Sequence, residues 1–350
     1  MTVSQRPWIR HAIEQLRREA NRSADTHLLR LDLPQFPGIP FYFKDEAAHP
    51  PGSLKHRLAR SLFLYALCNG RLREGQTVVD ASSGSTAISE AWFARLLGLP
   101  FVAVMPACTA PRKIAEVQAL GARCDLGDDP TDVHARAAWH AAHGACHLDQ
   151  FALAERATDW RGNNNIAESI LRQMALEPAA EPAWIVCGVG TGGTSATIGR
   201  YLRYQGLDTR LCVAEPTGGA FAQGWSTRDS AAVATRATVI EGIGRPRVEP
   251  GFLFDVVEDV VEVDDDRSIA CAWWLEKWLG RRYGGSSGTN LAACLHLAER
   301  MRAQGEQGAI VSLLCDRGER YAQTLFDPAW LRARSLAPDR QRSRLPPVPC

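Results

Sequence analysis

The sequence predicts an α/β protein whose parallel-rich sheets are covered by helices on both faces. Three observations lead to this prediction. Short apolar segments alternate along the chain with segments whose apolar residues recur at helical spacing. The predicted strands are almost continuously apolar, as in parallel sheets that are buried on both faces. With 350 residues, 45% of them hydrophobic, the chain can divide its core between two subdomains.

The predicted elements follow in chain order. Apolar spacing predicts an N-terminal helix over 8–22, which the Pro-rich segment 34–40 separates from the alternating region. The predicted strands are 41–43, 77–81, 101–105, 184–188, 211–214 and 309–314. The predicted helices are 56–69, 86–98, 111–120, 165–175, 194–204, 267–279 and 289–303. We expect a large subdomain over 1–40 and 151–330, a small one over 41–150, and a flexible basic, Pro-rich tail over 331–350.

Charge and composition exclude several classes of function. Forty basic and 39 acidic residues leave a net charge of +1, so nucleic acid and anionic membranes are not expected partners. The N-terminus lacks the apolar core of a signal peptide, and no apolar run is long enough for a membrane span. The ten cysteines show no framework spacing, so we expect reduced thiols in a cytoplasmic protein. Gly144 interrupts the group His140, His143, Cys146 and His147, and we expect no metal site there.

Lysine usage points to one candidate catalytic residue. Of the 40 basic residues only Lys44, Lys55, Lys113 and Lys277 are lysines. Arginine stays protonated and cannot form an imine, so a lysine kept in this chain is a candidate for amine chemistry. Lys55 follows Pro-Gly-Ser-Leu at the start of a predicted helix, whose positive end would lower the pKa of its amine. A solvated loop lysine is the alternative interpretation.

A glycine-rich segment follows the predicted strand 184–188. Residues 187–195 read Cys-Gly-Val-Gly-Thr-Gly-Gly-Thr-Ser, so backbone N–H groups can converge on an anion at the start of the next helix. The hydroxyls of Thr191 and Thr194 are further donors, which suits a terminal phosphate. The same glycines match a dinucleotide fingerprint with Glu215 as the ribose-binding acid, so a dehydrogenase stays open, as does a purely structural turn.

Two more segments place hydroxyl groups before helices. Residues 81–86, Ala-Ser-Ser-Gly-Ser-Thr, predict a second anion site, sized for a carboxylate, although Ser82 could simply be a helix cap. Residues 284–288, Gly-Gly-Ser-Ser-Gly, match the nucleophile elbow of serine hydrolases. A hydrolase would need an acid and then a histidine after Ser286, and the only later histidine, His296, lies close behind it. We therefore do not expect hydrolysis.

Together these segments, over about residues 40–326, resemble the fold type II pyridoxal-phosphate enzymes, specifically the cysteine synthase and cystathionine β-synthase family. The resemblance implies a two-subdomain, tryptophan synthase β-like fold, a homodimer, and pyridoxal 5'-phosphate carried as a Schiff base on Lys55. The implied cofactor-binding residues are Lys55, Ser85, Gly190, Thr191, Gly192, Gly193, Thr194, Gly242 and Ser286. The implied residues for the substrate carboxylate are Ser82, Ser83, Gly84, Ser85, Thr86 and Gln150.

The departures from the synthases indicate a branch of the family. Ser85 stands where synthases usually have Asn, His56 where they have Asp, and residues 158–165 read Thr-Asp-Trp-Arg-Gly-Asn-Asn-Asn. These segments look like the bacterial L-cysteine desulfhydrase branch, which implies β-elimination of L-cysteine to hydrogen sulfide, pyruvate and ammonia. A cysteine synthase, which performs β-replacement, stays an alternative. So does a non-catalytic partner-binding protein on a degenerate enzyme fold.

Overall fold

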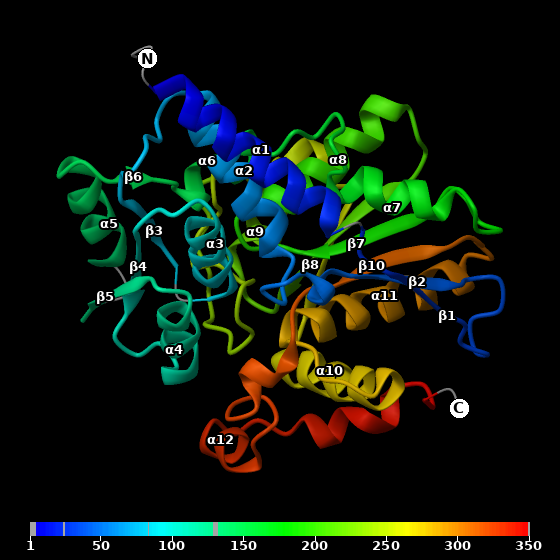
Figure 1. Cartoon of the computed structure of the whole chain (residues 1–350). Coiled ribbons are helices and arrows are strands. Elements are labelled where there is room, and N and C mark those ends of the chain that lie inside the picture. Colours follow the sequence, from blue (N-terminus) through cyan, green and yellow to red (C-terminus); the bar gives the residue numbers. More distant parts are fainter. Residues whose placement is uncertain (1–4, 24, 83, 129–131, 349–350) are drawn as a thin grey trace. The chain divides into compact units, whose positions relative to one another are not determined.

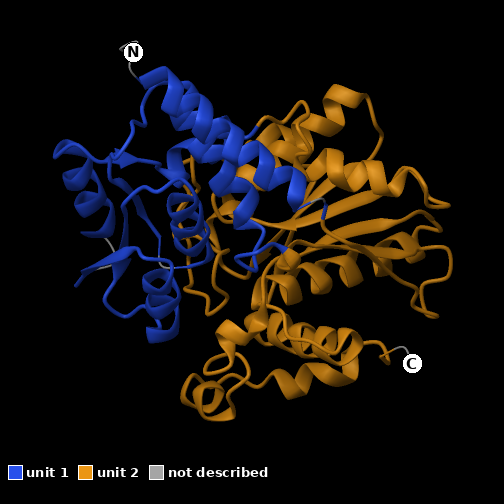
Figure 2. Cartoon of the chain, viewed as in Figure 1, with its two compact units in different colours: residues 1–25, 49–158 blue, residues 26–48, 159–350 orange. Residues whose placement is uncertain are grey.

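A computed structural model describes residues 5–23, 25–82, 84–128 and 132–348. The chain forms two compact units, which Figure 2 colours separately. Unit 1 comprises residues 1–25 and 49–158, and unit 2 comprises residues 26–48 and 159–350. Each unit contains a sheet covered by helices, and the expected α/β class with parallel-rich sheets is confirmed (Figure 1).

Unit 1 contains a parallel four-stranded sheet in the order β5-β4-β3-β6. Residues 78–81 of β3 pair in register with residues 101–104 of β4, and all of β3 is buried. The strands are β3 (Val78–Ala81), β4 (Phe101–Pro106), β5 (Arg123–Gly127) and β6 (Cys146–His147). The helices are α1 (Arg6–Arg22), α2 (Lys55–Cys68), α3 (Ser85–Leu96), α4 (Pro111–Ala119), α5 (Asp132–Ala142) and α6 (Gln150–Ala157).

Unit 2 contains a six-stranded sheet in the order β1-β2-β10-β7-β8-β9, in which only the β1–β2 pair is antiparallel. The strands are β1 (Leu28–Leu31), β2 (Phe41–Asp45), β7 (Trp184–Gly188), β8 (Arg210–Pro216), β9 (Asp259–Val263) and β10 (Ile310–Leu314). The α-helices are α7 (Ile166–Met174), α8 (Gly193–Gln205), α9 (Ala220–Thr227), α10 (Asp265–Leu279), α11 (Gly285–Ala303) and α12 (Pro328–Ala333). Short 3₁₀-helices are η2 (Glu46–Ala48), η3 (Phe254–Val256), η4 (Gly318–Tyr321) and η5 (Pro338–Arg344).

The bounds of the two units differ from those of the expected subdomains at two places, helix α1 and strand β2. Helix α1 packs its buried Ala12 and Leu16 into the core of unit 1, whereas we expected residues 1–40 in the large subdomain. Strand β2 pairs with β10 in unit 2, whereas we expected residues 41–150 together. Both differences come from tertiary packing, which local sequence patterns do not reveal.

In unit 2 the sheet lies between two helical layers, with α11 along one face and α7 and α8 on the other (Figure 1). Helices α10 and α11 approach closely because Gly288 has no side chain: a Cβ there would collide with the Ser268 carbonyl oxygen. The expected tail also packs on α10, since Trp274 Nε1 donates to the Pro346 carbonyl oxygen over 2.7 Å. The described part of 331–350 is therefore not the free tail that its composition predicts.

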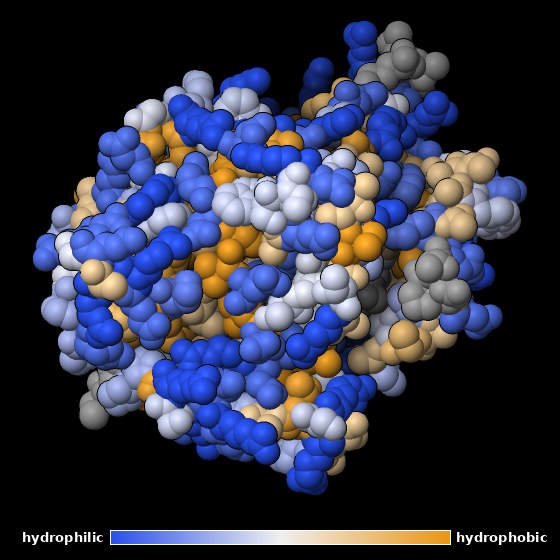
Figure 3. All heavy atoms as spheres, turned by 180° about the vertical axis from the view of Figure 1, so that it is seen from behind, coloured by the Kyte–Doolittle hydropathy of each residue, from blue (hydrophilic) through white to orange (hydrophobic). Residues whose placement is uncertain are grey.

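The apolar side chains lie mainly in the interiors of the two units. On the face shown in Figure 3, hydrophilic residues predominate and apolar residues form short patches between them. Among the described residues, no helix has both the length and the apolar character that a membrane crossing requires.

Candidate functional site

The glycine-rich loop of unit 2 forms an anion cradle between β7 and α8. Gly192 is the N-cap residue of α8, with φ at 82°, a left-handed conformation that glycine adopts without strain. A Cβ at Gly190 would collide with the Gly242 carbonyl oxygen, and one at Gly192 would collide with the backbone of Gly251 and Phe252. The first N–H groups of α8 have no partner within the helix and carry its positive end. The loop therefore offers donors to an anion such as a phosphate.

The same part of unit 2 brings two further predicted residues to this loop. Gly242, with φ at 87°, lies against Gly190. Ser286 lies in the first turn of α11, is 7% exposed, and is one helical turn before Asn290. Asn290 Oδ1 and the Ile243 side chain lie within 3.3 Å of the position that a Cβ on Gly188 would occupy. Unit 2 thus places the cradle, Gly242 and the start of α11 around the carboxyl end of β7.

The dinucleotide interpretation fails at its acidic residue. Glu215 is fully buried, and its two carboxylate oxygens accept hydrogen bonds from the backbone N–H groups of Phe221, over 3.1 Å, and Ala222, over 2.7 Å. These contacts hold the start of α9. Burial raises the pKa of Glu215 to about 7, although both hydrogen bonds oppose this shift. A carboxylate used in this way is not presented to a ribose hydroxyl.

In unit 1 a tight turn delivers Lys55 to the first position of α2. Gly52 has φ at 74°, and its N–H donates to the His49 carbonyl oxygen over 2.7 Å. The backbone N–H of Lys55 then donates to Ser53 Oγ over 3.2 Å. Lys55 is half-buried. A half-buried amine at a helix N-terminus suits a Schiff-base lysine.

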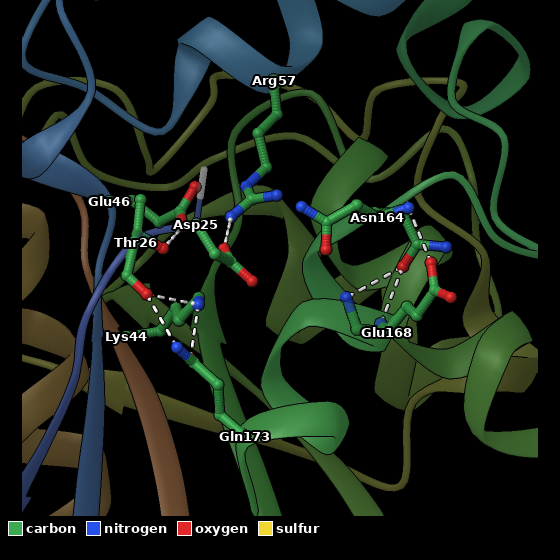
Figure 4. Close-up of polar contacts among 10 residues, drawn as sticks. Asp25, Thr26, Lys44, Glu46, Arg57, Asn164, Glu168 and Gln173 are labelled. Carbon is green, nitrogen blue, oxygen red and sulfur yellow. Dashed lines mark hydrogen bonds and ion pairs between the residues drawn. The ribbon is translucent and has the colours of Figure 1, made fainter. Parts of the chain in front are cut away.

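Another lysine is engaged in structural contacts. Lys44 of β2 is fully buried, and its Nζ donates to the Thr26 carbonyl oxygen over 2.8 Å and to Gln173 Oε1 over 2.5 Å. Thr26 Oγ1 donates in turn to Glu46 (Figure 4). Lys277 lies exposed on α10. Lys55 is therefore a stronger candidate for amine chemistry than Lys44 or Lys277.

The predicted carboxylate loop follows β3 in unit 1, and its Ser82 acts as a helix cap. Ser82 Oγ accepts from the N–H groups of Ala87, over 3.2 Å, and Gly84, over 3.4 Å. Ser85 and Thr86 begin α3, and the first N–H groups of any helix point toward its positive end, where an anion can bind. Ser83, also predicted, lies outside the described residues.

Gln150 joins this loop to the start of α6. Its side-chain Nε2 donates to the Ala81 carbonyl oxygen over 3.0 Å, and its backbone N–H donates to Asp80 Oδ2 over 3.3 Å. The side chain is 3% exposed. Unit 1 therefore brings the predicted Gln150 to the base of the loop 82–86, at the carboxyl end of β3.

The sequence analysis did not identify a pair of buried acidic residues near this loop, Asp80 of β3 and Glu90 of α3. Asp80 and Glu90 are both buried, and His147 Nε2 lies 3.2 Å from Asp80 Oδ1. Burial raises the pKa of Glu90 well above 4.5, and the nearby Asp80 raises it further. The contact with Asp80 raises the pKa of His147, against the effect of burial. An acid within the small and apolar residues of α3 was the signal in the sequence.

This pair predicts a pH-dependent stability. Folded Glu90 keeps its proton above pH 4.5, where the unfolded residue loses it, so the free energy of unfolding should fall as pH rises by up to about 1.4 kcal/mol per pH unit. Glu90→Gln removes this dependence, so its stability relative to the natural protein should rise with pH. Urea unfolding at pH 5 to 8 measures it, with the exposed Glu74→Gln as control. A constant difference across this range would contradict the protonated Glu90.

The chain is similar to known proteins over most of its length. The family model described as "Pyridoxal-phosphate dependent enzyme" matches residues 22–316. The chain is 54% identical over 338 residues to the L-cysteine desulfhydrase Cds1 of Mycobacterium tuberculosis, covering 95% of this chain and 92% of that protein. It is 29% identical over 332 residues to cysteine synthase 1 of Neurospora crassa, covering 89% and 84% of the two chains.

Solved structures give the same picture. One is an O-ureido-L-serine synthase variant with O-ureido-L-serine bound, which has a TM-score of 0.75 and 28% identity and covers 89% of this chain and 96% of its own. Another is a hydrogen sulfide-producing enzyme in complex with an α-aminoacrylate intermediate, with a TM-score of 0.77 and 25% identity over 89% of this chain and 91% of its own. These similarities extend across the segments that carry the candidate residues of both units.

Proposed function

Because the chain belongs to the family of pyridoxal-phosphate dependent enzymes, we propose that it is an L-cysteine desulfhydrase. Such an enzyme converts L-cysteine and water into hydrogen sulfide, pyruvate and ammonia. The observation that carries the proposal is the 54% identity with the relative of that name, over 95% of this chain. The family resemblance expected from the sequence is confirmed, and the enzyme class and cofactor follow from it.

The residues present fit pyridoxal 5'-phosphate. A phosphate dianion suits the cradle at 190–194, where the absence of a Cβ on Gly190 and Gly192 lets neighbouring backbone segments approach the loop closely. The Ser286 hydroxyl, in the buried first turn of α11, is a neutral group that would serve the pyridine nitrogen. Lys55 would hold the carbonyl carbon, with Ser85 and Gly242 as further cofactor contacts.

In this proposal, side chains of the protein favour loss of the β-substituent over transamination. The bound cofactor supplies an electron sink that makes the Cα proton of an amino acid removable and lets a β-thiol leave. The Lys55 amine would take that proton as general base. The neutral Ser286 hydroxyl would not keep the ring nitrogen protonated as a carboxylate would, which favours loss of the β-substituent over transamination. Residues 82–86 and Gln150 would hold the substrate carboxylate.

A substrate test separates elimination from replacement. With L-cysteine alone, the enzyme should release sulfide and pyruvate in equal amounts over many turnovers, because water converts the enamine that remains after each sulfide leaves into pyruvate and ammonia. A dedicated synthase must exclude water until a nucleophile arrives, so it would do this poorly. Ser85→Asn, which introduces the synthase residue, should shift the partition toward cysteine formation from O-acetylserine and sulfide.

The cysteine synthase relatives favour a second candidate function. If cysteine alone yields almost no pyruvate while O-acetylserine and sulfide react rapidly, the enzyme is a synthase and the proposal is wrong. Sulfide is measured as methylene blue and pyruvate by coupling to lactate dehydrogenase. The natural protein and Ser85→Asn are compared at equal cofactor content.

We propose in addition that the enzyme works as a cytoplasmic homodimer. The family resemblance supports the dimer. The free cysteines of the structure, several of them buried, support a reducing compartment. Light scattering on the eluted protein should give about twice the chain mass of 38.4 kDa. A mass equal to that of one chain would contradict the dimer.

A further inference from the structure

Glu19 of α1 and His56 of α2 form a buried polar contact next to Lys55. Glu19 is 3% exposed and His56 is fully buried. His56 Nε2 lies 2.8 Å from Glu19 Oε1, which also accepts from Ser23 Oγ over 2.6 Å. The other carboxylate oxygen of Glu19 lies 3.2 Å from Arg60 Nε. Glu19 of α1 therefore contacts two residues in the first turns of α2, His56 and Arg60.

The protonation states at this contact are set by burial and by the partners. Burial lowers the pKa of His56 to about 4; the Glu19 contact opposes this shift, and His49 and Arg60 add to it. Burial alone would raise the pKa of Glu19, but His56, Ser23 and Arg60 lower it to about 2. Near pH 7 a carboxylate thus faces a neutral imidazole. Since Glu19 can only accept, the His56 ring carries its proton on Nε2 and makes a charge-assisted hydrogen bond.

The His56 ring is also held by packing on three sides. It stacks on Phe93 of α3, with ring centroids 4.6 Å apart and planes at 24°. Its edge contacts with Trp92 are at 5.1 Å, and the His49 ring lies 4.9 Å away. His49 belongs to the turn that leads to Lys55. A single ring therefore links α1, α3 and this turn.

The backbone around Lys55 is also held by Ser53. The N-cap residue of α2, Leu54, makes no side-chain capping bond. Ser53 supplies the nearby contacts: its carbonyl oxygen accepts from the His56 N–H over 3.1 Å, and its hydroxyl accepts from the Lys55 N–H. Consecutive Cα atoms are about 3.8 Å apart, so a shift of His56 moves Lys55 with it.

We infer that Glu19 and His56 are positioning residues, which fix the first turn of α2 and thereby the direction of the Lys55 side chain. The inference rests on the proposed function, in which Lys55 is the catalytic amine. The imidazole of His56 connects the acid of α1 to the turn that leads to Lys55.

A double-mutant cycle tests the pair. His56→Phe keeps the aromatic packing and removes the Nε2 donor, and Glu19→Met removes the acceptor at similar volume. Each should lower kcat about 10- to 100-fold, because a lysine misplaced by about 1 Å reacts poorly, while KM changes less than about threefold. The kcat of the double variant should be no lower than that of the less active single variant, because both substitutions remove the same contact. Glu19→Gln keeps an acceptor and should retain kcat within about threefold of the natural value.

A spectroscopic readout accompanies the kinetics. In each holoenzyme, the visible absorption of the Lys55-bound cofactor is titrated with pH. Its midpoint should shift by about half a unit or more in His56→Phe and Glu19→Met, since the surroundings of the amine change. The control Ser23→Ala removes another hydrogen bond to Glu19 without touching His56. It should lower Tm slightly and leave both kcat and the midpoint unchanged.

The outcomes separate the inference from the function on which it rests. If the natural protein releases no sulfide from cysteine, the proposed function fails, whatever the variants do. If the natural protein is active and the variants keep its kcat and midpoint, the positioning role is wrong. The positioning role is also wrong if the losses of kcat in the two single variants add up in the double variant and increase with the fall in Tm, because destabilisation alone produces that pattern. If His56→Phe does not fold, equal kcat in Glu19→Met and Glu19→Gln overturns it, and loss in Glu19→Met alone supports it.

Discussion

Lys55→Ala should fold normally and lose nearly all turnover. Under the proposed function, the variant lacks both the amine that attaches the cofactor and the base that takes the Cα proton, so kcat for sulfide release from cysteine should fall by roughly 10³-fold or more. The side chain is half-buried at a helix start, where alanine is well tolerated, so Tm should change little. Free cofactor should still bind weakly, because the phosphate cradle is intact.

The matched control is Lys277→Ala, which removes an exposed lysine from α10. Its kcat and cofactor content should equal those of the natural protein. Turnover by Lys55→Ala within tenfold of the natural value would show that another group carries the chemistry.

Gly192→Asp should nearly abolish cofactor binding. The residue has a left-handed φ of 82°, a Cβ there would collide with the backbone of Gly251 and Phe252, and a carboxylate would repel the phosphate. Each lost hydrogen bond to a charged group costs about 1.5–3 kcal/mol, so affinity for pyridoxal 5'-phosphate should fall at least about 100-fold. Absorbance of the purified protein and titration with added cofactor measure this loss.

The opposite end of the same helix provides the control. Gly206 caps α8 at its C-terminus with φ at 66°, and a Cβ there meets open space. Gly206→Asp therefore introduces the same charge with comparable backbone strain, but away from the cradle. It should lower Tm without lowering cofactor content. Equal cofactor loss in both variants would mean that helix destabilisation, rather than the anion cradle, explains the effect.

Most of the fold could be predicted from local patterns, and the exceptions have physical reasons. The strand expected at 184–188 is β7, and the helix expected at 56–69 differs from α2 by one residue at each end. Strands β5 and β9 were missed because both lie at sheet edges and contain charged or half-exposed residues. The helix expected at 289–303 begins earlier, at Gly285, because Gly288 permits close packing of α11 on α10.

The parts of the candidate site that lie within one short motif could be proposed from the sequence. The lysine turn and the cradle at Gly190–Thr194 each lie within a few residues, and their spacing was visible in the sequence. The contacts of Glu19 with His56 and of Asp80 with Gln150 join residues far apart in the chain, so no local pattern revealed them. Ser82 could be a cap or a ligand by sequence, and its hydroxyl caps α3. Glu215 likewise matched a motif but holds α9.

Reduction of the purified enzyme with borohydride, followed by peptide mapping, tests most directly that this enzyme carries its cofactor on Lys55. The reagent fixes a Schiff base as a stable phosphopyridoxyl amine, and the chain contains only three other lysines, Lys44, Lys113 and Lys277. We expect the yellow colour to bleach and one modified peptide, the one that contains Lys55. A label on any of the other three lysines, or a colourless protein that takes no label in the presence of cofactor, would contradict the assignment.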